Sequence, residues 1–314
     1  MRGFIPWMKA VVFAYHNIGI VGVEALAKGK FDIQAIFSHL DDPEENIWFG
    51  SVAEWGKKNR IPVHCPKNVN TPEWIEMIRN LCPEAIFSFY YRNLLSRDIL
   101  MIPTGGSFNL HGSMLPAYRG RCPVNWVLVN GERRTGVTLH HIIEAPDAGD
   151  IVGQKEVVIE FEDTAYTLYQ KLCAKAEELL EEVLPLIKKG TAPRVVQNLK
   201  QGSYYGGRKP EDGRIDWNWP VTRIYNLVRA VTEPYPGAFT HFPEGEKLFI
   251  WWALPEEDRV SKGPAGALEF EKDNVYVRAS DGRLKLLDIE AGKKRMKGYQ
   301  ILEFFKKQKG AVLK

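Results

Sequence analysis

Apolar runs of strand length alternate with helical segments from residue 9 to residue 91, and this alternation constrains the fold more than any other feature. The candidate strands are residues 9–15, 31–39, 61–65 and 84–91. Helix signals lie between them, at residues 17–29, 51–60 and 71–81, and the last helix has Thr71 as its cap and Pro72 at its first position. The pattern predicts βαβ units in a mostly parallel sheet of an α/β protein, whose ligands bind beyond the carboxyl ends of the strands.

A long amphipathic helix is predicted over residues 163–190. Its apolar stripe consists of Leu168, Leu172, Leu179, Val183 and Ile187. The composition then changes, because residues 197–213 are polar and rich in glycine, which is typical of a linker. Another helix is predicted over residues 217–231.

Short apolar runs separated by turns follow residue 237, and their spacing is typical of a small β-barrel or β-sandwich. A last helix is predicted over residues 298–308. The length of 314 residues exceeds what one hydrophobic core usually supports, so we expect two domains. We place them at residues 1–200 and 201–314.

Composition excludes several classes of protein. The net charge of +3, from 42 basic and 39 acidic residues, is too small to indicate a nucleic-acid partner. No apolar run has the length of a membrane span, and residues 1–9 lack the apolar core of a secretory signal. The cysteines are scattered and favour a reducing environment, so we expect a cytoplasmic protein; they are Cys65, Cys82, Cys122 and Cys173.

The glycines that follow the first predicted strand do not indicate a dinucleotide site. Gly19, Gly22 and Gly29 do not form G-x-G-x-x-G, and no P-loop motif is present. We expect these glycines to serve turns and helix packing, and we expect no NAD-dependent activity.

The stretch from residue 107 to residue 150 contains the best candidates for chemistry. Asn109 and His111 are two residues apart on a short apolar strand, so their side chains point to the same side. A loop rich in Pro, Gly and Arg follows at residues 115–123, where neither a packed strand nor a helix is expected. A strand-like run then ends near Asp147 in a PDAGD turn. An amide, an imidazole and a carboxylate at the ends of neighbouring elements favour acyl-type chemistry.

The residues alone leave alternatives open. An active site and a buried structural histidine are equally consistent with His111. Arg119 and Arg121 suit either a grip on an anionic substrate or a solvated loop. Cys122 has no base beside it in the sequence, which argues against a nucleophilic role.

A metal site is not expected in this stretch. His140 and His141 are adjacent and therefore point to opposite faces of a strand, and no His or Cys pair has ligand spacing. Asp150 fits a turn residue better than a second catalytic acid.

Several segments resemble the folate-dependent formyltransferases, a family that includes methionyl-tRNA formyltransferase, glycinamide ribonucleotide transformylase and the amino-sugar formyltransferases. The signature is FNLHGSMLPAYRGRCPVNW (108–126) followed by PDAGDI (146–151). Further segments that fit are FSFYYRNLL (87–95), NWVLVNGE (125–132), VRAVTEPYPGAF (228–239) and GKKRM (292–296). The two-domain length fits as well, because the glycinamide enzyme lacks a comparable second domain.

The resemblance implies a Rossmann-like N-terminal domain, a small OB-like β-barrel as C-terminal domain, and N10-formyltetrahydrofolate as the formyl donor, with no metal. It implies that His111 transfers the proton and that Asn109 and Asp147 act on the transition state. Arg119 and Tyr118 are the expected contacts to the acceptor. The expected folate contacts are Asn93, Leu94, Leu95, Arg121, Ile143, Glu144, Ala145, Pro146 and Asp147.

Within the family, the chain resembles most closely the branch that formylates UDP-4-amino-4-deoxy-L-arabinose, which is one domain of a bifunctional polymyxin-resistance enzyme. This resemblance implies a role in lipid A modification and in resistance to cationic antimicrobial peptides. The other domain of that enzyme is a decarboxylase, and we expect no decarboxylation from this chain.

Methionyl-tRNA is the main rival acceptor, because that branch of the family binds tRNA through a basic insertion after the second strand. Here the position holds four acidic residues, Asp41, Asp42, Glu44 and Glu45, which would repel an acceptor stem. Other nucleotide-linked amino sugars stay open as acceptors. A non-catalytic protein that only binds folate or a sugar nucleotide is disfavoured, because the catalytic set of Asn109, His111 and Asp147 is intact.

Overall fold

The computed structural model of the protein describes residues 7–43, 45–257, 263–308 and 310–314. The expectation that no secretory signal is present depends largely on residues 1–6, which lie outside this range. The chain forms two compact units. The first contains Met1–Pro123, Arg134–Val158 and Tyr169–Gly206, and the second contains Val124–Arg133, Ile159–Leu168 and Gly207–Lys314.

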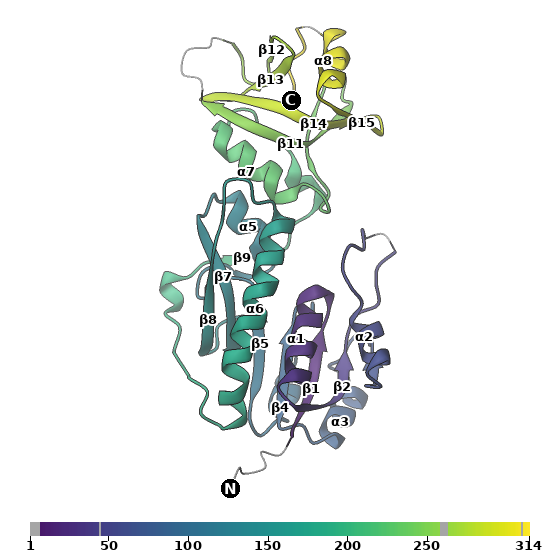
Figure 1. Cartoon of the computed structure of the whole chain (residues 1–314), viewed down its shortest axis with the longest axis vertical. Helices are drawn as coiled ribbons and strands as arrows, with labels where there is room; N and C mark the ends of the chain where they lie inside the picture. The colour runs from purple at the N-terminus through teal and green to yellow at the C-terminus, as the bar shows by residue number, and fades with distance from the viewer. Residues whose placement is uncertain (1–6, 44, 258–262, 309) are drawn as a thin grey trace. The chain divides into compact units, whose positions relative to one another are not determined.

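The first unit is built on a seven-stranded sheet (Figure 1). Its strands, in spatial order, are β3 (Val63–His64), β2 (Phe31–Phe37), β1 (Met8–Ala14), β4 (Ala85–Phe89), β5 (Ser107–His111), β7 (Arg134–His141) and β8 (Ile151–Val158). The pairs from β3 to β5 are parallel, and β7 and β8 continue the sheet in antiparallel fashion. The predicted mostly parallel sheet is confirmed.

Helices cover both faces of this sheet. Helices α1 (His16–Lys28) and α6 (Ala165–Lys188) contact each other, through an ion pair of Lys28 with Glu177 at 2.5 Å. Gly22 lets α1 approach β4 closely, since a Cβ there would lie 2.2 Å from the Phe89 ring. The expectation that this glycine serves helix packing is therefore confirmed.

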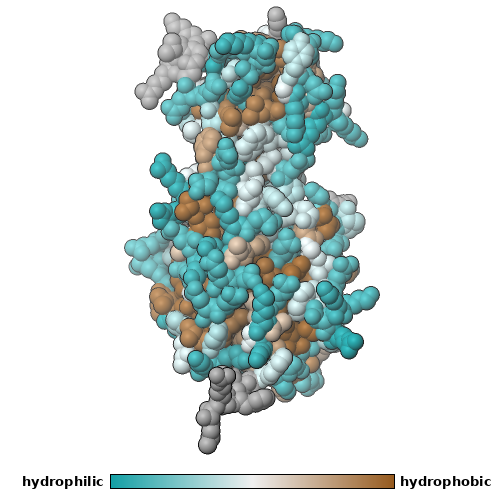
Figure 2. All heavy atoms as spheres, viewed as in Figure 1, coloured by the Kyte–Doolittle hydropathy of each residue, from teal (hydrophilic) through white to brown (hydrophobic). Residues whose placement is uncertain are grey.

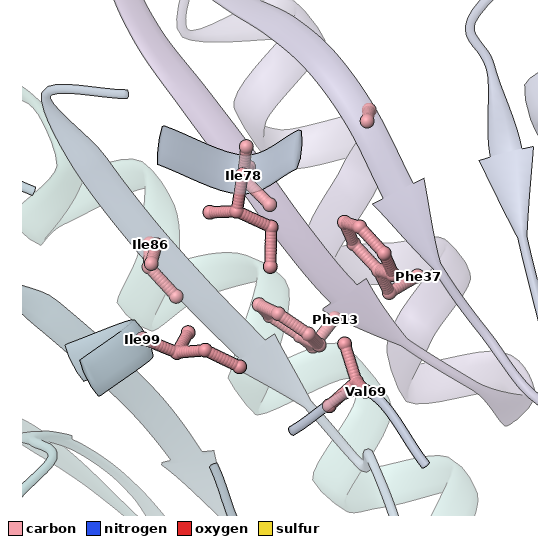
Figure 3. Close-up of a cluster of buried hydrophobic side chains, with 8 residues drawn as sticks. Phe13, Phe37, Val69, Ile78, Ile86 and Ile99 are labelled. Carbon is pink, nitrogen blue, oxygen red and sulfur yellow. The ribbon is translucent and has the colours of Figure 1, made fainter. Parts of the chain in front are cut away.

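The hydrophobic core on the other face lies beneath α3 (Pro72–Asn80) and α4 (Arg97–Leu100). Alternate residues of the central strands point into it, and the buried set is Val11, Phe13, Ala35, Phe37, Val69, Ile78, Ile86 and Ile99. Figure 3 shows Phe13 among the labelled side chains, with Ile78 from α3 and Ile99 from α4 near its ring. Burial on both faces explains why these strands read as continuous apolar runs.

Two helix starts differ from the sequence prediction, one in its capping and one in its position. Thr71 precedes α3 as predicted, but its side chain makes no capping hydrogen bond. The helix predicted from residue 217 begins later, as α7 (Val221–Val231). The carboxylate of Asp216 accepts hydrogen bonds from Asn218, which holds a turn there, and Pro220 occupies the N-cap.

Several short elements complete the first unit. Helix α2 (Val52–Lys58) follows β2 and is capped by the Ser51 side chain. The loop at residues 115–123, where no strand was expected, contains β6 (Arg119–Gly120), which pairs with β9 (Tyr204–Tyr205). The first half of the predicted linker is therefore packed against this loop, and the division between the units, at Gly206 and Gly207, lies inside the predicted linker.

The second unit contains a six-stranded antiparallel sheet. The strands are β10 (Ala238–His241), β11 (Lys247–Glu257), β14 (Gly282–Ala291), β13 (Asn274–Arg278) and β12 (Leu268–Glu271), with β15 (Lys294–Lys297) paired to β14. Its helical elements are most of α5 (Pro123–Val129), α7 and α8 (Tyr299–Lys306), with the short 3₁₀ turn η2 (Pro210–Gly213) before α7. The 3₁₀ turn η1 (Leu199–Gln201) belongs to the first unit. The all-β character predicted here is confirmed, and its closure into an OB-like barrel stays a prediction.

Hydrophilic side chains cover most of the face shown in Figure 2, and apolar residues form scattered patches between them. Among the described helices, none is long and apolar enough to cross a membrane.

Candidate active site

Asn109 and His111 lie on β5, at the end of the parallel part of the sheet. Their alternation with buried Phe108 and Leu110 points both side chains to one face, as predicted. Asn109 lies between Ser88 of β4 and His140 of β7 in the sheet register.

The tautomer of His111 is set by a backbone carbonyl. The ring is 7% exposed, and its Nε2 lies 2.8 Å from the carbonyl oxygen of Tyr118. A carbonyl oxygen only accepts, so Nε2 carries a hydrogen and donates. In the neutral ring the lone pair is then on Nδ1, which lies 3.5 Å from Oδ1 of Asp147. Burial lowers the pKa of His111, against the opposing effects of Asp147 and the Tyr118 carbonyl, so the imidazole is neutral near pH 7.

Asp147 contacts the other catalytic candidates through Oδ1 and the backbone of Gly120 through Oδ2. Oδ2 accepts from the backbone N–H of Gly120 at 2.9 Å, and Oδ1 accepts from Nδ2 of Asn109 at 3.3 Å. Burial favours the neutral acid, but the positive charge of a protonated His111 or His140 and the hydrogen bond from the Gly120 amide favour the carboxylate more strongly, so the pKa of Asp147 lies well below its ordinary value. The structure thus brings together Asn109, His111 and Asp147, a neutral imidazole facing an ionised carboxylate.

His140 belongs to the same cluster, and the sequence analysis missed it. Its Nδ1 donates to the backbone carbonyl of His141 at 2.8 Å, so its Nε2 is free to accept from Nδ2 of Asn109 at 3.1 Å. Both amide hydrogens of Asn109 are therefore directed, one to His140 and one to Asp147. A residue directly opposite Asn109 on the neighbouring strand must share its face, but the register of β5 with β7 that makes His140 this residue is seen only in the structure.

His141 points to the other face of β7, as the alternation predicts. Its ring packs against Phe108 at a centroid distance of 4.8 Å. Burial and the positive charge of Arg194 lower its pKa to about 4. It is therefore a neutral packing histidine.

The loop between β5 and α5 contains the predicted acceptor contacts. Tyr118 is 8% exposed and its ring stacks on Tyr205, so its backbone is the part that reaches the catalytic cluster. The Nε of Arg119 is buried and has no hydrogen-bond partner among the described residues. Arg121 is exposed. Cys122, half-buried, adopts a positive φ of 54° between Arg121 and Pro123.

Apart from Arg121, the predicted folate contacts lie on two turns, at residues 93–95 and 143–147, and an ion pair connects them. Arg97, which follows the turn at 93–95, lies 3.5 Å from Glu144 in the turn at 143–147, and both side chains are exposed. Each turn presents an apolar side chain to solvent, since Leu94 is 68% and Ile143 is 47% exposed. The Asn70 side chain donates to the carbonyl of Leu94 and holds the first turn in place. Asn93, Glu144 and Ala145 are also exposed, whereas Leu95, Pro146 and Asp147 are half-buried.

The acidic loop after β2 contacts the same edge of the sheet. Asp41 accepts from the Tyr15 hydroxyl at 2.9 Å, and Glu45 accepts two hydrogen bonds from Arg92, at 2.9 and 2.8 Å. Arg92 also lies over the Tyr15 ring, 4.7 Å from its centroid. Glu44 lies outside the described residues. The negative charge of this loop is thus partly compensated, by Arg92.

Among the residues that the structure describes, no group of three or more His, Cys, Asp or Glu side chains is arranged to hold a metal ion.

Comparison with known families decides the class of protein. The family model "Formyl transferase" matches residues 22–184, and the model "Formyl transferase, C-terminal domain" matches residues 208–306. The chain belongs to the formyl transferase family. The protein is therefore an enzyme of formyl transfer, and each family model corresponds mainly to one of the two units.

Two solved sugar formyltransferases are similar in fold over most of their length. The N-formyltransferase of Helicobacter canadensis, solved with folinic acid and dTDP-3-aminofucose, is 22% identical with a TM-score of 0.68, over 89% of this chain and 98% of that one. The sugar 3N-formyl transferase WlaRD, solved with dTDP and 5-N-formyl-THF, is 19% identical with a TM-score of 0.67, over 93% and 100%.

A third similar structure is that of a smaller formyltransferase, and it bears on the two-domain organisation of the present chain. Phosphoribosylglycinamide formyltransferase of Bacillus halodurans is 24% identical with a TM-score of 0.51, over 58% of this chain and 96% of that one. The smaller enzyme thus matches little more than half of the chain, which agrees with the expectation that it lacks a comparable second domain.

Proposed function

We propose that this formyltransferase transfers the formyl group of N10-formyltetrahydrofolate to the 4-amino group of UDP-4-amino-4-deoxy-L-arabinose. The observation that supports formyl transfer most directly is the buried cluster of Asn109, His111 and Asp147 on β5 and the turn beside it. The choice of acceptor rests on the resemblance of the sequence to that branch of the family. A cytoplasmic role in lipid A modification and antimicrobial-peptide resistance follows from this choice.

The reaction begins with attack of the unprotonated sugar amine on the formyl carbon, which forms the new C–N bond. Nδ1 of His111 takes the proton of the amine, because Nε2 is already protonated. Asp147 stabilises the imidazolium that results. The proton then passes to N10 of the folate as the C–N10 bond breaks, which returns His111 to its neutral form.

The charge that develops on the formyl oxygen needs a hydrogen-bond donor. Asn109 is placed to supply it, by exchanging its longer contact, 3.3 Å to Asp147, for the oxygen of the substrate. Its shorter contact, 3.1 Å to His140, keeps the amide oriented during that exchange. One donor of this kind typically contributes about 10²–10³-fold to turnover.

The two turns at 93–95 and 143–147 fit the folate. Leu94 and Ile143 expose apolar surface on turns that the pair of Arg97 and Glu144 connects, which suits a flat ring system. Arg121 is exposed in the loop at residues 115–123, called the catalytic loop below, and suits the glutamate carboxylates of the donor. The solved relatives with folinic acid and 5-N-formyl-THF support a folate donor.

The acceptor carries a diphosphate, for which few cations suffice. Arg119 is the best contact in the catalytic loop, because its buried Nε lacks a partner among the described residues. A tRNA would need many cations, whereas the loop after β2 presents Asp41 and Asp42 beside the paired Glu45. Methionyl-tRNA is therefore the less favoured alternative.

Another nucleotide-linked amino sugar is the closer alternative. The solved relatives are described with dTDP-3-aminofucose and with dTDP, which differ from the proposed acceptor in base and in the position of the amine. The catalytic chemistry is the same for all of these acceptors.

The test is a panel of acceptors incubated with N10-formyltetrahydrofolate and the wild-type enzyme. The panel contains UDP-4-amino-4-deoxy-L-arabinose, a dTDP-3-amino sugar and charged initiator methionyl-tRNA, and formylated products are identified by mass. We expect the highest kcat/KM with the UDP sugar. Preference for the dTDP sugar would move the proposal to the alternative acceptor, and transfer to tRNA alone would contradict the argument from the acidic loop.

A further inference from the structure

Residues 195–205, here called the strap, contact both loops that contain the catalytic cluster. The strap begins where Val195 pairs with Ile151, with hydrogen bonds of 3.0 and 2.8 Å in the two directions. It ends at β9, which pairs with β6 of the catalytic loop. Residues 197–205 of the strap belong to the stretch that its composition marked as a linker.

One half of the strap holds the catalytic loop through backbone hydrogen bonds. Arg119 N–H donates to the carbonyl of Ser203 at 3.0 Å, and Arg121 N–H donates to the carbonyl of Tyr205 at 2.9 Å. The hydroxyl of Ser203 accepts from Tyr118 N–H at 2.9 Å. The Tyr205 ring stacks on the Tyr118 ring at a centroid distance of 4.9 Å.

The opposite side of the same loop contacts His111 and Asp147. The Tyr118 carbonyl accepts from His111, and the Gly120 N–H, between the two amides that face the strap, donates to Asp147. Residues 118–121 are thus held by the strap on one side and by His111 and Asp147 on the other, so a shift of the strap would move the carbonyl and the amide that contact these two residues. The position of the strap is thereby coupled to the tautomer of His111.

Two glycines allow this close approach. A Cβ on Gly120 would lie 2.2 Å from the carbonyl oxygen of Tyr205, and one on Gly202 would lie 2.3 Å from the carbonyl oxygen of Pro116. Gly120 also has a φ of +96°, which L side chains rarely adopt.

The first half of the strap holds the turn of Asp147. The side-chain amide of Gln197, which is 8% exposed, donates to the carbonyls of Asp147 and Gly149 at 3.0 and 2.6 Å. Asp147 has a φ of +52°, a conformation that costs free energy in a residue with a side chain and therefore needs support.

We propose that the strap is a positioning element of the active site, with Ser203 and Gln197 as positioning residues. Ser203 fixes the loop that holds His111 in its Nε2–H tautomer, and Gln197 fixes the turn that directs Asp147 toward Nδ1. Neither residue touches the reacting atoms. The consequence for turnover rests on the proposed function, whereas the consequence for the tautomer does not.

The first test measures the tautomer of His111 directly, by ¹⁵N chemical shifts of its imidazole in full-length protein. Wild type should show the Nε2–H form. Ser203→Ala, which leaves the Tyr118 N–H without its acceptor, should show a mixture of tautomers. Ser203→Thr keeps a hydroxyl and should restore the wild-type spectrum, and Gln201→Ala, at an exposed position of η1, is the matched control.

The second test measures formyl transfer in the same variants. Ser203→Ala should lower kcat by about tenfold, as expected for one lost hydrogen bond, with KM for both substrates changed by less than about twofold. Ser203→Thr should recover most of kcat. If Ser203→Ala does not fold, Gly202→Ala serves instead, because its Cβ pushes the strap away from Pro116.

A folded variant of Ser203 or Gly202 with the wild-type tautomer and the wild-type kcat would overturn the proposal. Equal losses of kcat in the Ser203→Ala and Gln201→Ala proteins would overturn the proposal as well, because they would indicate a general effect on folding. The tautomer measurement needs no acceptor, so a wild-type enzyme that does not formylate the chosen sugar would contradict the proposed function alone.

Discussion

The backbone carbonyl of Tyr118 lies 2.8 Å from Nε2 of His111 and leaves Nδ1 as the basic nitrogen of the neutral ring. In many sites that pair an imidazole with a carboxylate, the carboxylate orients the imidazole. In the structure the carbonyl orients it, and Asp147, 3.5 Å from Nδ1, is placed to stabilise the ring after proton transfer. The two roles belong to different groups and can be separated by experiment.

Replacement of Asp147 by Asn should lower the pKa of His111 further. Burial already holds this pKa below its ordinary value of 6.5, and the charge of Asp147 is the main effect that raises it. Without that charge the imidazolium loses stabilisation, so the midpoint falls and kcat falls by about 10²–10³-fold. The measurement is an NMR titration of the His111 ring in the wild type and in Asp147→Asn. A midpoint that rises in the variant would show that Asp147 does not stabilise the charged ring.

Replacement of His140 should impair catalysis through Asn109. His140→Ala removes the acceptor that orients one amide hydrogen of Asn109, and we expect kcat to fall by about tenfold. His140→Gln offers a side-chain oxygen as acceptor and should retain more activity. Steady-state kinetics of the two variants would decide, and equal losses in both would indicate that the ring of His140 serves packing instead.

The placement of Asn109 and His111 on β5 was predictable because it depends on a local pattern. Alternation placed Asn109 and His111 on one face, and the βαβ pattern predicted a parallel sheet with its loops at one edge. The contact between Asp147 and His111 could not be predicted in this way. It depends on β7 lying beside β5, and this pairing joins residues distant in sequence.

Two parts of the site were not predictable from residue types. The carbonyl of Tyr118 and the amide of Gly120 are backbone groups, which every residue but proline offers, so their role has no compositional signal. The strap was read as a linker because polar and glycine-rich sequence usually indicates one. Here the glycine at 202 permits close packing of two backbones instead.

Stability of the first unit should fall on acidification, partly because of His16. This ring is 4% exposed, and burial and the nearby charge of Arg92 lower its pKa to about 3. The unfolded chain therefore takes up the proton first, near pH 6.5, so the stabilisation is complete above that pH and is lost progressively below it. Between pH 7 and pH 5 the loss from this one group is about 2 kcal/mol.

His16→Asn removes this titration, and Asn tolerates the positive φ of 66° at that position. We expect the difference in unfolding free energy between pH 7 and pH 5, measured with urea, to shrink by about 2 kcal/mol in the variant. The other buried histidines contribute equally to the pH dependence of the unfolding free energy in the wild type and in His16→Asn. An unchanged difference would mean that His16 is protonated in the folded protein.

The role of His111 is tested most directly by formyl transfer from N10-formyltetrahydrofolate to UDP-4-amino-4-deoxy-L-arabinose, measured for the wild type and for His111→Ala. We expect a product that carries a formyl group in place of one amine hydrogen, identified by its mass, and a loss of about 10²–10⁴-fold in kcat for the variant. Transfer at the wild-type rate by a folded His111→Ala enzyme would contradict the assignment of His111 as the proton-transferring residue, and with it the central claim.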